Sequence, residues 1–441
     1  MKSKKTIFLE RILKFFTKAI LKKYNPQIVA ITGSVGKTTT KEMIGGVLEN
    51  FKETRKSSKN FNNEIGLPLT VIGYYPNNFS IIGWMTVFFK AIGLILFPSK
   101  YPEILVLEMG ADQPGDIKYL CDFVPVSVGI LTGVGVSHLE KFKTKSAIIK
   151  EKGHLLKQLP AQGLGVYNFD NEEVREVGEN INANMVSYGF EDGAQVRATD
   201  VLFGYELFRD PSGMERKILR GVSFKLNYQG KIIPVRLNHC IGKGQIYSAL
   251  AVFAIGSYFD LNLVEIAEIL KNQYPVPGRM NLLDGIKKTT VIDDTYNSAP
   301  DSVLSALDAV QKIDASRKIV ALGDMLELGD EETSSHKGVG KVLAESNIDF
   351  FVTVGKRMSL AADEFSRLRG TNSQVAKFNN PMDAGIFIQN LLKEGDLVLV
   401  KGSQGMRMEK IVCEIMANPL EKEKLLVRQE QKWQEKEFET Q

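Results

Sequence analysis

Cysteine is scarce in this sequence. Cys121, Cys240 and Cys413 are its three cysteines, and they lie far apart with no Cys-x-x-Cys pair. This scarcity excludes a disulfide framework and gives no indication of a zinc knuckle. The reducing cytoplasm is therefore the compartment that suits the chain best.

An excess of charge of one sign is also missing. The 56 basic and 52 acidic side chains leave a net charge of +4, which is too balanced to indicate nucleic acid as the main partner. Internal repeats and low-complexity tracts are absent as well. The length of 441 residues, with 44% hydrophobic and 24% charged residues, is typical of a globular protein with two or three domains.

No apolar run has the purity of a membrane span. The most apolar window, 79–97, contains Lys90 and two glycines. The first 26 residues interleave lysines with apolar residues and lack a small-residue cleavage site, which predicts a basic amphipathic helix rather than a signal peptide. Two interpretations stay open: residues 1–23 and 79–97 contact the inner face of the cytoplasmic membrane, or they pack against this protein or a partner.

What the sequence does contain is a regular alternation of apolar runs and helical patterns. The run 27–32 precedes a helical pattern over 37–50, which predicts a strand, a phosphate loop and a helix. Further runs begin at Ile104 and Val128, and together they predict a parallel, doubly wound sheet. Alternating residues between 196 and 237 predict an antiparallel hairpin added to that sheet, followed by a helix over 244–258.

Tyr274–Arg279 (YPVPGR) contains two prolines and a glycine and predicts a domain boundary. Four apolar runs beyond it each precede a helical pattern, which predicts a second, Rossmann-like sheet. The predicted fold class is therefore α/β, with four parts. These are a basic amphipathic helix at 1–26, a central P-loop-type ATPase domain at 27–275 with an apolar insertion at 77–100, a Rossmann-like domain at 276–420, and a charged tail at 421–441 that forms a solvated helix.

The segment TGSVGKTTTKEM places glycines, a lysine and hydroxyls where a strand turns into a helix. Backbone N–H groups at such a turn bind phosphate, a lysine neutralises β/γ-phosphate charge, and a threonine hydroxyl ligates magnesium. Only two residues separate Gly33 from Gly36, where the general pattern has four. The predicted nucleotide-binding residues here are Gly33, Ser34, Val35, Gly36, Lys37, Thr38 and Thr39.

The shortened pattern TGxxGKT resembles the Mur ligases, and further segments follow in that family's order. These are NFNNEIGLP (60–68), EMGADQPGDI (108–117), GVSHLEKF (135–142), PGRMN (277–281), DDTYNSAPDS (293–302), LGDMLELG (322–329) and KGSQGMRME (401–409). Each segment alone is weak, and the joint order makes the resemblance specific. Together they look like the branch that adds D-alanyl-D-alanine to the UDP-muramoyl tripeptide of peptidoglycan, using ATP.

Glu108 ends an apolar run, at the edge of a parallel sheet where ligands gather, and a carboxylate there suits a metal. The resemblance implies two Mg²⁺ ions, held by Thr38, Glu108, His138 and Lys152. It also implies that Lys152 is carbamoylated, with the neighbouring Lys150 as the competing candidate. The catalytic residues implied are Lys37, His138 and Lys152.

The resemblance assigns further residues to nucleotide and substrates. For nucleotide these are Gln245, Arg279, Asp294, Tyr296 and Asn297; for substrates they are Asn60, Asn63, Asp324, Glu327, Lys401 and Ser403. His336 also matches a family position, but we expect no catalytic role for it. On the predicted helix over 244–258, Gly244 and Ser248 stand where the family has histidine and asparagine.

The Mur ligases normally carry a UDP-binding domain before the phosphate loop, and here 31 residues precede Thr32. Three functions therefore stay open. The first is the D-alanyl-D-alanine-adding ligase, and the second is a related ligase for another carboxylate, such as a polyglutamyl or lipid-linked one. The third is a membrane-associated P-loop ATPase, which would explain neither Lys152 nor the loop at 293–297.

Overall fold

The computed structural model describes residues 4–58, 61–76, 80–135, 142, 144–181, 183–209, 215–370 and 374–434. The chain divides into two compact units. The first comprises Met1–Val201, Phe224–Arg236 and Lys243–Gln273, and the second comprises Leu202–Ser223, Leu237–Gly242 and Tyr274–Gln441.

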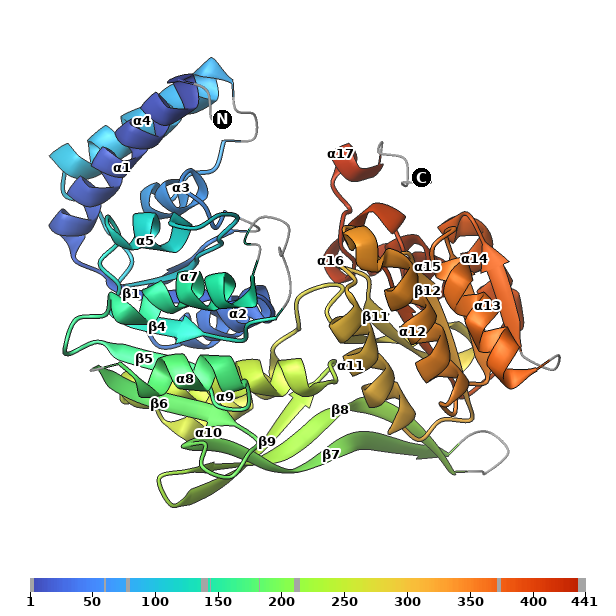
Figure 1. The fold of residues 1–441 in the computed structure, drawn as a ribbon. Helices are drawn as coiled ribbons and strands as arrows, with labels where there is room; N and C mark the ends of the chain where they lie inside the picture. The colour runs from blue at the N-terminus through green and yellow to red at the C-terminus, as the bar shows by residue number, and fades with distance from the viewer. Residues whose placement is uncertain are drawn as a thin grey trace. The chain divides into compact units, whose positions relative to one another are not determined.

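A nine-stranded sheet runs through the first unit in the order β2-β3-β1-β4-β5-β6-β7-β8-β9 (Figure 1). The pairs from β2 to β7 are parallel. The strands are β1 (Gln27–Thr32), β2 (Thr54–Lys56), β3 (Ile104–Glu108), β4 (Val128–Leu131), β5 (Leu164–Asn168), β6 (Asn184–Gly189), β7 (Val196–Arg209), β8 (Glu215–Tyr228) and β9 (Lys231–Asn238). Because β1 lies between β3 and β4, the strands that follow β1 in the sequence lie first on one side of it and then on the other. The strand order therefore reverses at β1.

The strand sequences explain these positions. β1 and β3 are continuous apolar runs and are buried almost throughout, as expected for central strands covered on both faces. β8 and β9 are joined by Gln229 and Gly230, both of which have positive φ angles, 50° and 73°. Positive φ at both central residues is typical of the two-residue turn that joins antiparallel strands.

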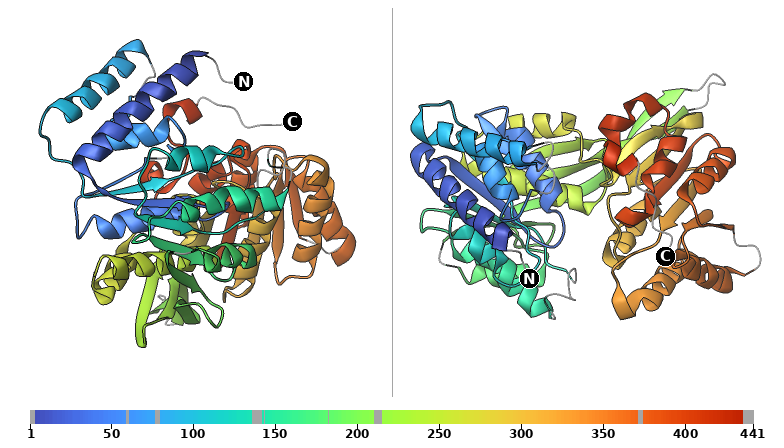
Figure 2. Two further views of the ribbon diagram at one scale, coloured as in Figure 1. Left: turned by 60° about the vertical axis from the view of Figure 1, so that its left-hand side comes forward. Right: turned by 90° about the horizontal axis from the view of Figure 1, so that it is seen from above.

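Helices cover both faces of this sheet (Figures 1 and 2). One layer contains α2 (Lys37–Leu48), α9 (Lys243–Tyr258) and α10 (Leu263–Asn272). The other contains α5 (Asp116–Cys121), α7 (Lys145–Lys157) and α8 (Glu172–Glu179), together with α3 (Gly66–Ile72), on which α1 (Lys4–Tyr24) and α4 (Ile81–Leu96) pack. Buried residues of α1, α3, α4 and the strands belong to one hydrophobic core.

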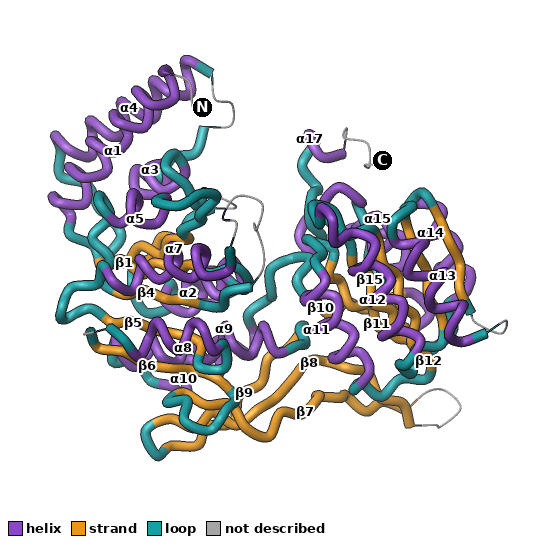
Figure 3. The backbone as a smooth tube through the Cα atoms, viewed as in Figure 1, coloured by secondary structure: helices purple, strands orange, loops and turns teal. Residues whose placement is uncertain are grey.

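The second unit has a six-stranded sheet in the order β10-β11-β15-β12-β13-β14, in which the β10–β11 pair is antiparallel and the other pairs are parallel (Figure 3). Its strands are β10 (Asn281–Gly285), β11 (Thr289–Asp294), β12 (Arg317–Gly323), β13 (Phe350–Val354), β14 (Val375–Phe378) and β15 (Asp396–Lys401). The predicted α/β fold class with two largely parallel sheets is therefore confirmed.

Helices also lie on both faces of this second sheet (Figure 3). On one face are α11 (Pro300–Gln311), α12 (Glu332–Ala344) and α13 (Met358–Arg369), and on the other are α14 (Pro381–Leu391) and α15 (Glu409–Ile415). Helix α14 begins at Pro381 because the residues there favour a helix start. The side chain of Asn380 accepts a hydrogen bond from the backbone N–H of Met382, and Pro381 occupies the first turn.

The C-terminal segment differs from the predicted solvated helix. It forms two short helices, α16 (Lys422–Leu425) and α17 (Gln431–Gln434), and between them Leu426 and Arg428 are buried. The high charge of the segment had indicated exposure to solvent. Arg428 is nevertheless buried, because the carboxylate of Glu409 pairs with it. Among the described residues, no helix has both the length and the apolar character needed to cross a membrane.

Candidate functional site

The phosphate loop lies at the carboxyl end of β1, at the point where strand order reverses. Open α/β sheets bind ligands at such points. Gly36 precedes α2 with a φ of 82°, a left-handed conformation that glycine adopts without strain. The loop is fixed from β4, because the hydroxyl of Thr132 donates to the carbonyl of Val35 (2.6 Å) and the N–H of Ser34 donates to the carbonyl of Gly133 (2.6 Å).

Lys37 is the first residue of α2 and reaches back over this loop. Its ammonium group donates to the carbonyls of Gly33 (2.8 Å) and Ser34 (3.3 Å). The positive end of a helix and a lysine thus converge on one loop, an arrangement that favours a bound anion. The predicted loop residues Ser34, Val35 and Lys37 are therefore brought together, with the side chain of Val35 61% exposed.

Thr38 and Glu108 meet beside the loop. The hydroxyl Oγ1 of Thr38 donates to Oε2 of Glu108 (3.0 Å), although 70 residues separate them, because β1 and β3 are parallel neighbours. The other oxygen of Glu108, Oε1, accepts from the side-chain amide of Asn62 (3.1 Å). Asn62 was not among the predicted residues, although it lies in the same motif as the predicted Asn60 and Asn63.

Lys152 lies on α7 with its side chain buried and 2% exposed. Burial, as the larger cause, and the positive charge of Lys37, as the second, together lower the pKa of Lys152 to about 7, although the carboxylates of Glu151, Asp112 and Glu108 act in the opposite direction. These influences place Lys152 within electrostatic reach of both the phosphate-loop lysine and Glu108. A pKa near neutrality leaves much of the amine unprotonated, which is the nucleophilic form.

The remaining predicted residues of the first unit that the structure describes lie in α2, in α9 or just before α3. Thr39 is buried in α2. Gln245 is buried in the first turn of α9, the helix whose Ser248 shares a hydrogen bond with Thr40 of α2 (3.0 Å). Asn63 accepts from the N–H of Gly66 (2.9 Å) at the start of α3, which is a local capping contact. Asn60 and His138 lie outside the described residues.

The chemistry of the donor atoms fits Mg²⁺, which prefers oxygen ligands. Thr38 offers a hydroxyl and Glu108 a carboxylate, 3.0 Å apart at one sheet edge. Within the parts of the chain that the structure describes, no group of three or more His, Cys, Asp or Glu side chains is placed to hold a metal ion. Thr38 and Glu108 thus offer two kinds of oxygen ligand at this sheet edge.

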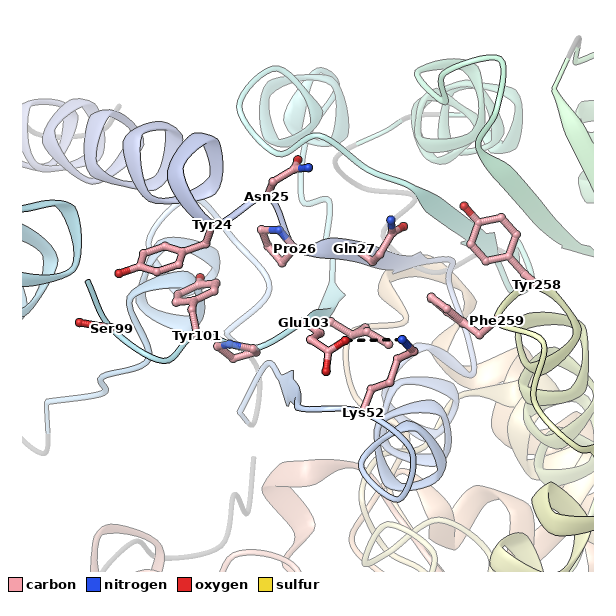
Figure 4. A pocket seen from close by; sticks show the side chains of 12 residues that line it. Tyr24, Asn25, Pro26, Gln27, Lys52, Ser99, Tyr101, Glu103, Tyr258 and Phe259 are labelled. Atoms are coloured by element: carbon pink, nitrogen blue, oxygen red, sulfur yellow. Dashed lines mark hydrogen bonds and ion pairs between the residues drawn. The ribbon is translucent and has the colours of Figure 1, made fainter. Parts of the chain in front are cut away.

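A hollow of about 680 Å³ lies elsewhere on the first unit (Figure 4). Its walls include Tyr24, Gln27 and Tyr101, and the rings of Tyr24 and Tyr101 stack with their centroids 4.4 Å apart. Gln27 and Ile104 begin β1 and β3, so the hollow lies at the opposite edge of the sheet from the phosphate loop. It contains no residue of the predicted site.

In the second unit, predicted residues meet at the carboxyl ends of β11, β15 and β12. Lys401 is 2% exposed and pairs with Asp294 (Nζ to Oδ2, 2.6 Å), and it also donates to the carbonyl of Asn297 (2.9 Å). The hydroxyl of Ser403 donates to the carbonyl of Ser298 (3.2 Å) and accepts from the N–H of Leu326 (2.8 Å). Lys401 and Ser403, predicted for substrates, thus bind the loop predicted for nucleotide.

Asp324 lies next to this loop and is almost fully buried. Its Oδ1 accepts from the N–H of Met358 (2.6 Å), and burial raises its pKa. Glu327 is exposed, with a φ of 63°. His336 is fully buried and accepts a hydrogen bond at Nε2 from the N–H of Met325 (3.1 Å), a contact that shapes the loop.

Asp293 is fully buried directly before the loop. Its carboxylate accepts hydrogen bonds from the N–H of Gly278 (3.1 Å) and from the hydroxyl of Thr295 (2.6 Å). Burial raises its pKa from 3.8 to about 7 even so, because these bonds only partly offset the loss of water. The folded state therefore binds a proton that the unfolded state releases between these two pH values.

We expect Asp293→Asn to flatten the pH dependence of stability. Because the pKa of Asp293 is higher in the folded state, its contribution to the free energy of unfolding is complete below pH 3.8. This contribution is lost as the pH rises through about 7. The free energy of unfolding of the wild type should fall by up to roughly 4 kcal/mol more than that of the variant across this window. Urea unfolding at a series of pH values measures the difference, and parallel curves for the two proteins would contradict the assignment.

The C-terminal segment also binds the loop that follows Asp293. Arg428 donates to the carbonyls of Thr295 (3.0 Å) and Tyr296, and its guanidinium pairs with Glu409 (3.1 Å). Arg407 also pairs with Glu409 (2.6 Å), so one buried carboxylate is shared by two guanidinium groups. The loop is therefore held by Arg428, which is more than 130 positions away in the sequence, and no local pattern indicates this contact.

Arg279 and Tyr296, both predicted to contact nucleotide, lie against each other. The guanidinium of Arg279 is 3.9 Å from the centre of the Tyr296 ring, within the range of a cation–π contact. The N–H of Tyr296 donates to the carbonyl of Gly278 (3.0 Å). The predicted residues of the PGRMN and DDTYN segments thus form one cluster.

Comparisons with known proteins agree with both units. The Mur ligase middle domain family matches residues 31–81 and 94–256, and the Mur ligase glutamate ligase domain family matches residues 278–404. The UDP-N-acetylmuramoyl-tripeptide--D-alanyl-D-alanine ligase of Bacillus subtilis (strain 168) is 29% identical over 411 residues, which are 92% of this chain and 80% of the relative.

Two solved structures have the same fold. The MurF ligase from Thermotoga maritima in complex with ADP superimposes with a TM-score of 0.73 and 25% identity, over 91% of this chain and 82% of that one. MurF from Acinetobacter baumannii gives a TM-score of 0.73 and 25% identity, over 93% and 81%. Because the two family matches together span most of the sequence and follow the boundaries of its two sheets, the chain belongs to the Mur ligase family.

Proposed function

We propose that this protein is an ATP-dependent ligase that adds D-alanyl-D-alanine to UDP-N-acetylmuramoyl-tripeptide. The observation that carries the proposal is the contact between Thr38 and Glu108 beside the phosphate loop of Lys37, with Lys152 buried within electrostatic reach of Lys37 and Glu108. A phosphate loop alone would suit any nucleotide enzyme. The added carboxylate and the low-pKa lysine suit the activation of a second, acidic substrate, and the relatives named for this reaction support the choice.

The reaction divides into two steps. In the first, an oxygen of the peptide's terminal carboxylate attacks the γ-phosphorus of ATP, the bond to the bridging oxygen breaks, and ADP leaves. The N–H groups of the phosphate loop and the ammonium of Lys37 bind the charged phosphate oxygens during this transfer. In the second, the amine nitrogen of D-alanyl-D-alanine attacks the acyl carbon, loses a proton, and displaces phosphate to form the amide.

Thr38 and Glu108 are the described residues that would hold Mg²⁺. When bound, the ion would neutralise phosphate charge and polarise the phosphoryl oxygens. Asn62 orients Glu108, because it donates to the oxygen that does not contact Thr38. A second ion, with His138 as a ligand, remains part of the proposal.

Carbamoylation of Lys152 is also part of the proposal. The unprotonated amine attacks the carbon of CO₂ and releases a proton, which leaves an anionic carbamate on Nζ. Burial and the charge of Lys37 favour the unprotonated amine. The modification would turn a buried cation into a carboxylate-like group beside Glu108, which is the kind of oxygen ligand that a magnesium ion prefers.

The cytoplasm is the proposed compartment. Cys121, Cys240 and Cys413 are free thiols in the structure, and free thiols persist in a reducing environment. The proposed partners are the two small-molecule substrates.

The test is a turnover screen with ATP, Mg²⁺, UDP-N-acetylmuramoyl-tripeptide and D-alanyl-D-alanine. We expect ADP release only when both substrates are present, and a product whose mass equals their sum less one water. ADP release that needs the dipeptide but accepts only a polyglutamyl or lipid-linked carboxylate would favour the related ligase. ADP release that needs neither substrate would favour the P-loop ATPase.

A further inference from the structure

The outward face of α1 combines aromatic and basic side chains. Phe8 and Phe15 are 66% and 67% exposed. They share one stripe with exposed basic residues, because positions three or four apart lie on the same face of a helix. The basic residues of this stripe are Lys4, Arg11, Lys18 and Lys22. A face turned only to water would not need the two phenylalanines.

The outward face of α4 carries an apolar stripe from one end of the helix to the other. Ile82, Phe89 and Leu96 are 76%, 68% and 67% exposed, while Val87 and Ala91 on the opposite side are fully buried. The helical spacing extends the exposed stripe through two further positions. These are Met85 and Ile92, which are 49% and 40% exposed. A soluble protein with no partner for such a face would expose an unusually large apolar patch.

The two helices form one layer, in which they lie side by side on α3 (Figures 1 and 2). The rings of Phe16 and Phe88 are 5.9 Å apart between them. Lys23, near the end of α1, donates to the carbonyls of Leu94 (2.8 Å) and Ile95 (3.0 Å) at the end of α4. The apolar stripe therefore belongs to a helix that is fixed at its end, and we call the outward faces of both helices the α1–α4 surface.

The charge on this layer has one sign. Helix α1 has a single acidic residue, Glu10, which is 8% exposed, and the one charged residue of α4 is Lys90. The basic residues of α1 are Lys4, Lys5, Arg11, Lys14, Lys18, Lys22 and Lys23. An apolar stripe flanked by cations matches a lipid surface, in which acyl chains lie beneath anionic headgroups.

The comparisons set this layer apart from the family fold. The match to the Mur ligase middle domain is interrupted over residues 82–93, which are most of α4, and begins at residue 31, after α1. We infer that the α1–α4 surface attaches this protein to a bilayer that contains anionic lipid, with the apolar stripe in the headgroup region and the basic residues against the phosphates.

The experiment is flotation of the full-length protein with vesicles of phosphatidylcholine alone or mixed with phosphatidylglycerol. We expect binding to the mixed vesicles, at least tenfold weaker binding to pure phosphatidylcholine, and release by high salt. Phe89→Ser with Leu96→Ser should reduce binding at least tenfold. Lys18→Glu with Lys22→Glu should remove the preference for anionic lipid.

Leu420→Ser is the matched control, since Leu420 is 93% exposed on the second unit and its loss removes apolar surface elsewhere. It should bind vesicles like the wild type. Equal binding by the Phe89/Leu96 variant and the wild type would overturn the inference. So would a failure to bind any vesicle together with self-association that this variant abolishes, because the surface would then bind a second copy.

Circular dichroism spectra of the variants and the wild type are to be compared, and we expect them to match. Turnover with soluble substrates, measured in parallel, separates this inference from the proposed function. A variant that loses vesicle binding but keeps its turnover would show that the α1–α4 surface binds the membrane and is not required for the ligase reaction.

Discussion

Replacing Lys37 by alanine is expected to lower the rate of ATP-dependent ligation by about a thousandfold, because a positioned charge on a transferring phosphoryl group contributes on this scale. The fold should persist, since Lys37 is only partly buried and its ammonium group donates to loop carbonyls. Initial rates of ADP release, measured at saturating ATP, test the effect on kcat.

Lys52→Ala is the matched control for this variant. Lys52 is a partly exposed lysine of the same unit that pairs with Glu103, at the edge of the sheet opposite the phosphate loop. Its replacement should leave the rate within about twofold of wild type, since exposed ion pairs contribute little. A Lys37→Ala enzyme that kept a tenth of the wild-type rate would rule out phosphate binding by this lysine.

Lys152→Ala should be equally damaging, with a loss of about a thousandfold in ligation. The physical reason for this loss of rate differs from that in Lys37→Ala, because Lys152→Ala removes the proposed anionic carbamate beside Glu108 and not a cation at the phosphates. Small carboxylic acids added to the assay should restore part of the lost rate in this variant and none in Lys37→Ala. The wild type should lose activity when CO₂ is removed and regain it with bicarbonate.

Lys150→Ala provides the comparison, because Lys150 lies on the same helix and is exposed. Its activity should match the wild type. Labelling with ¹³C-bicarbonate should give a carbamate signal in the wild type and in Lys150→Ala, and none in Lys152→Ala. A signal that survives in Lys152→Ala would assign the modification to another lysine, and full activity of that variant would remove the carbamate from the mechanism.

The sequence predicted those parts of the site that depend on local pattern. The run ending at Thr32, the glycines after it and the helix at Lys37 form one continuous strand-loop-helix unit, so composition and spacing determine it. Glu108 was predicted in the same way, because it ends an apolar run and strand ends of a parallel sheet meet at one edge. The contact between Thr38 and Glu108 follows from that topology.

Contacts between distant segments could not be predicted. Asn62 was missed in favour of its neighbours, because three asparagines in one short segment look alike until the fold selects the one that reaches Glu108. The burial of Arg428 was missed because a charged side chain normally indicates solvent, and its partner Glu409 becomes visible only when the chain has folded back. The roles assigned to the individual site residues, Gln245, Asp324 and Glu327 among them, stay predictions.

The division of the chain has a consequence for how such proteins diversify. The polypeptide changes from one unit to the other five times, since Leu202–Ser223 and Leu237–Gly242 group with the second unit although residues on both sides of them belong to the first. Neither half is therefore a contiguous cassette. Recombination between homologous genes at a single crossover would divide at least one of the two units between two parents, so we expect inheritance of the two units as a linked pair.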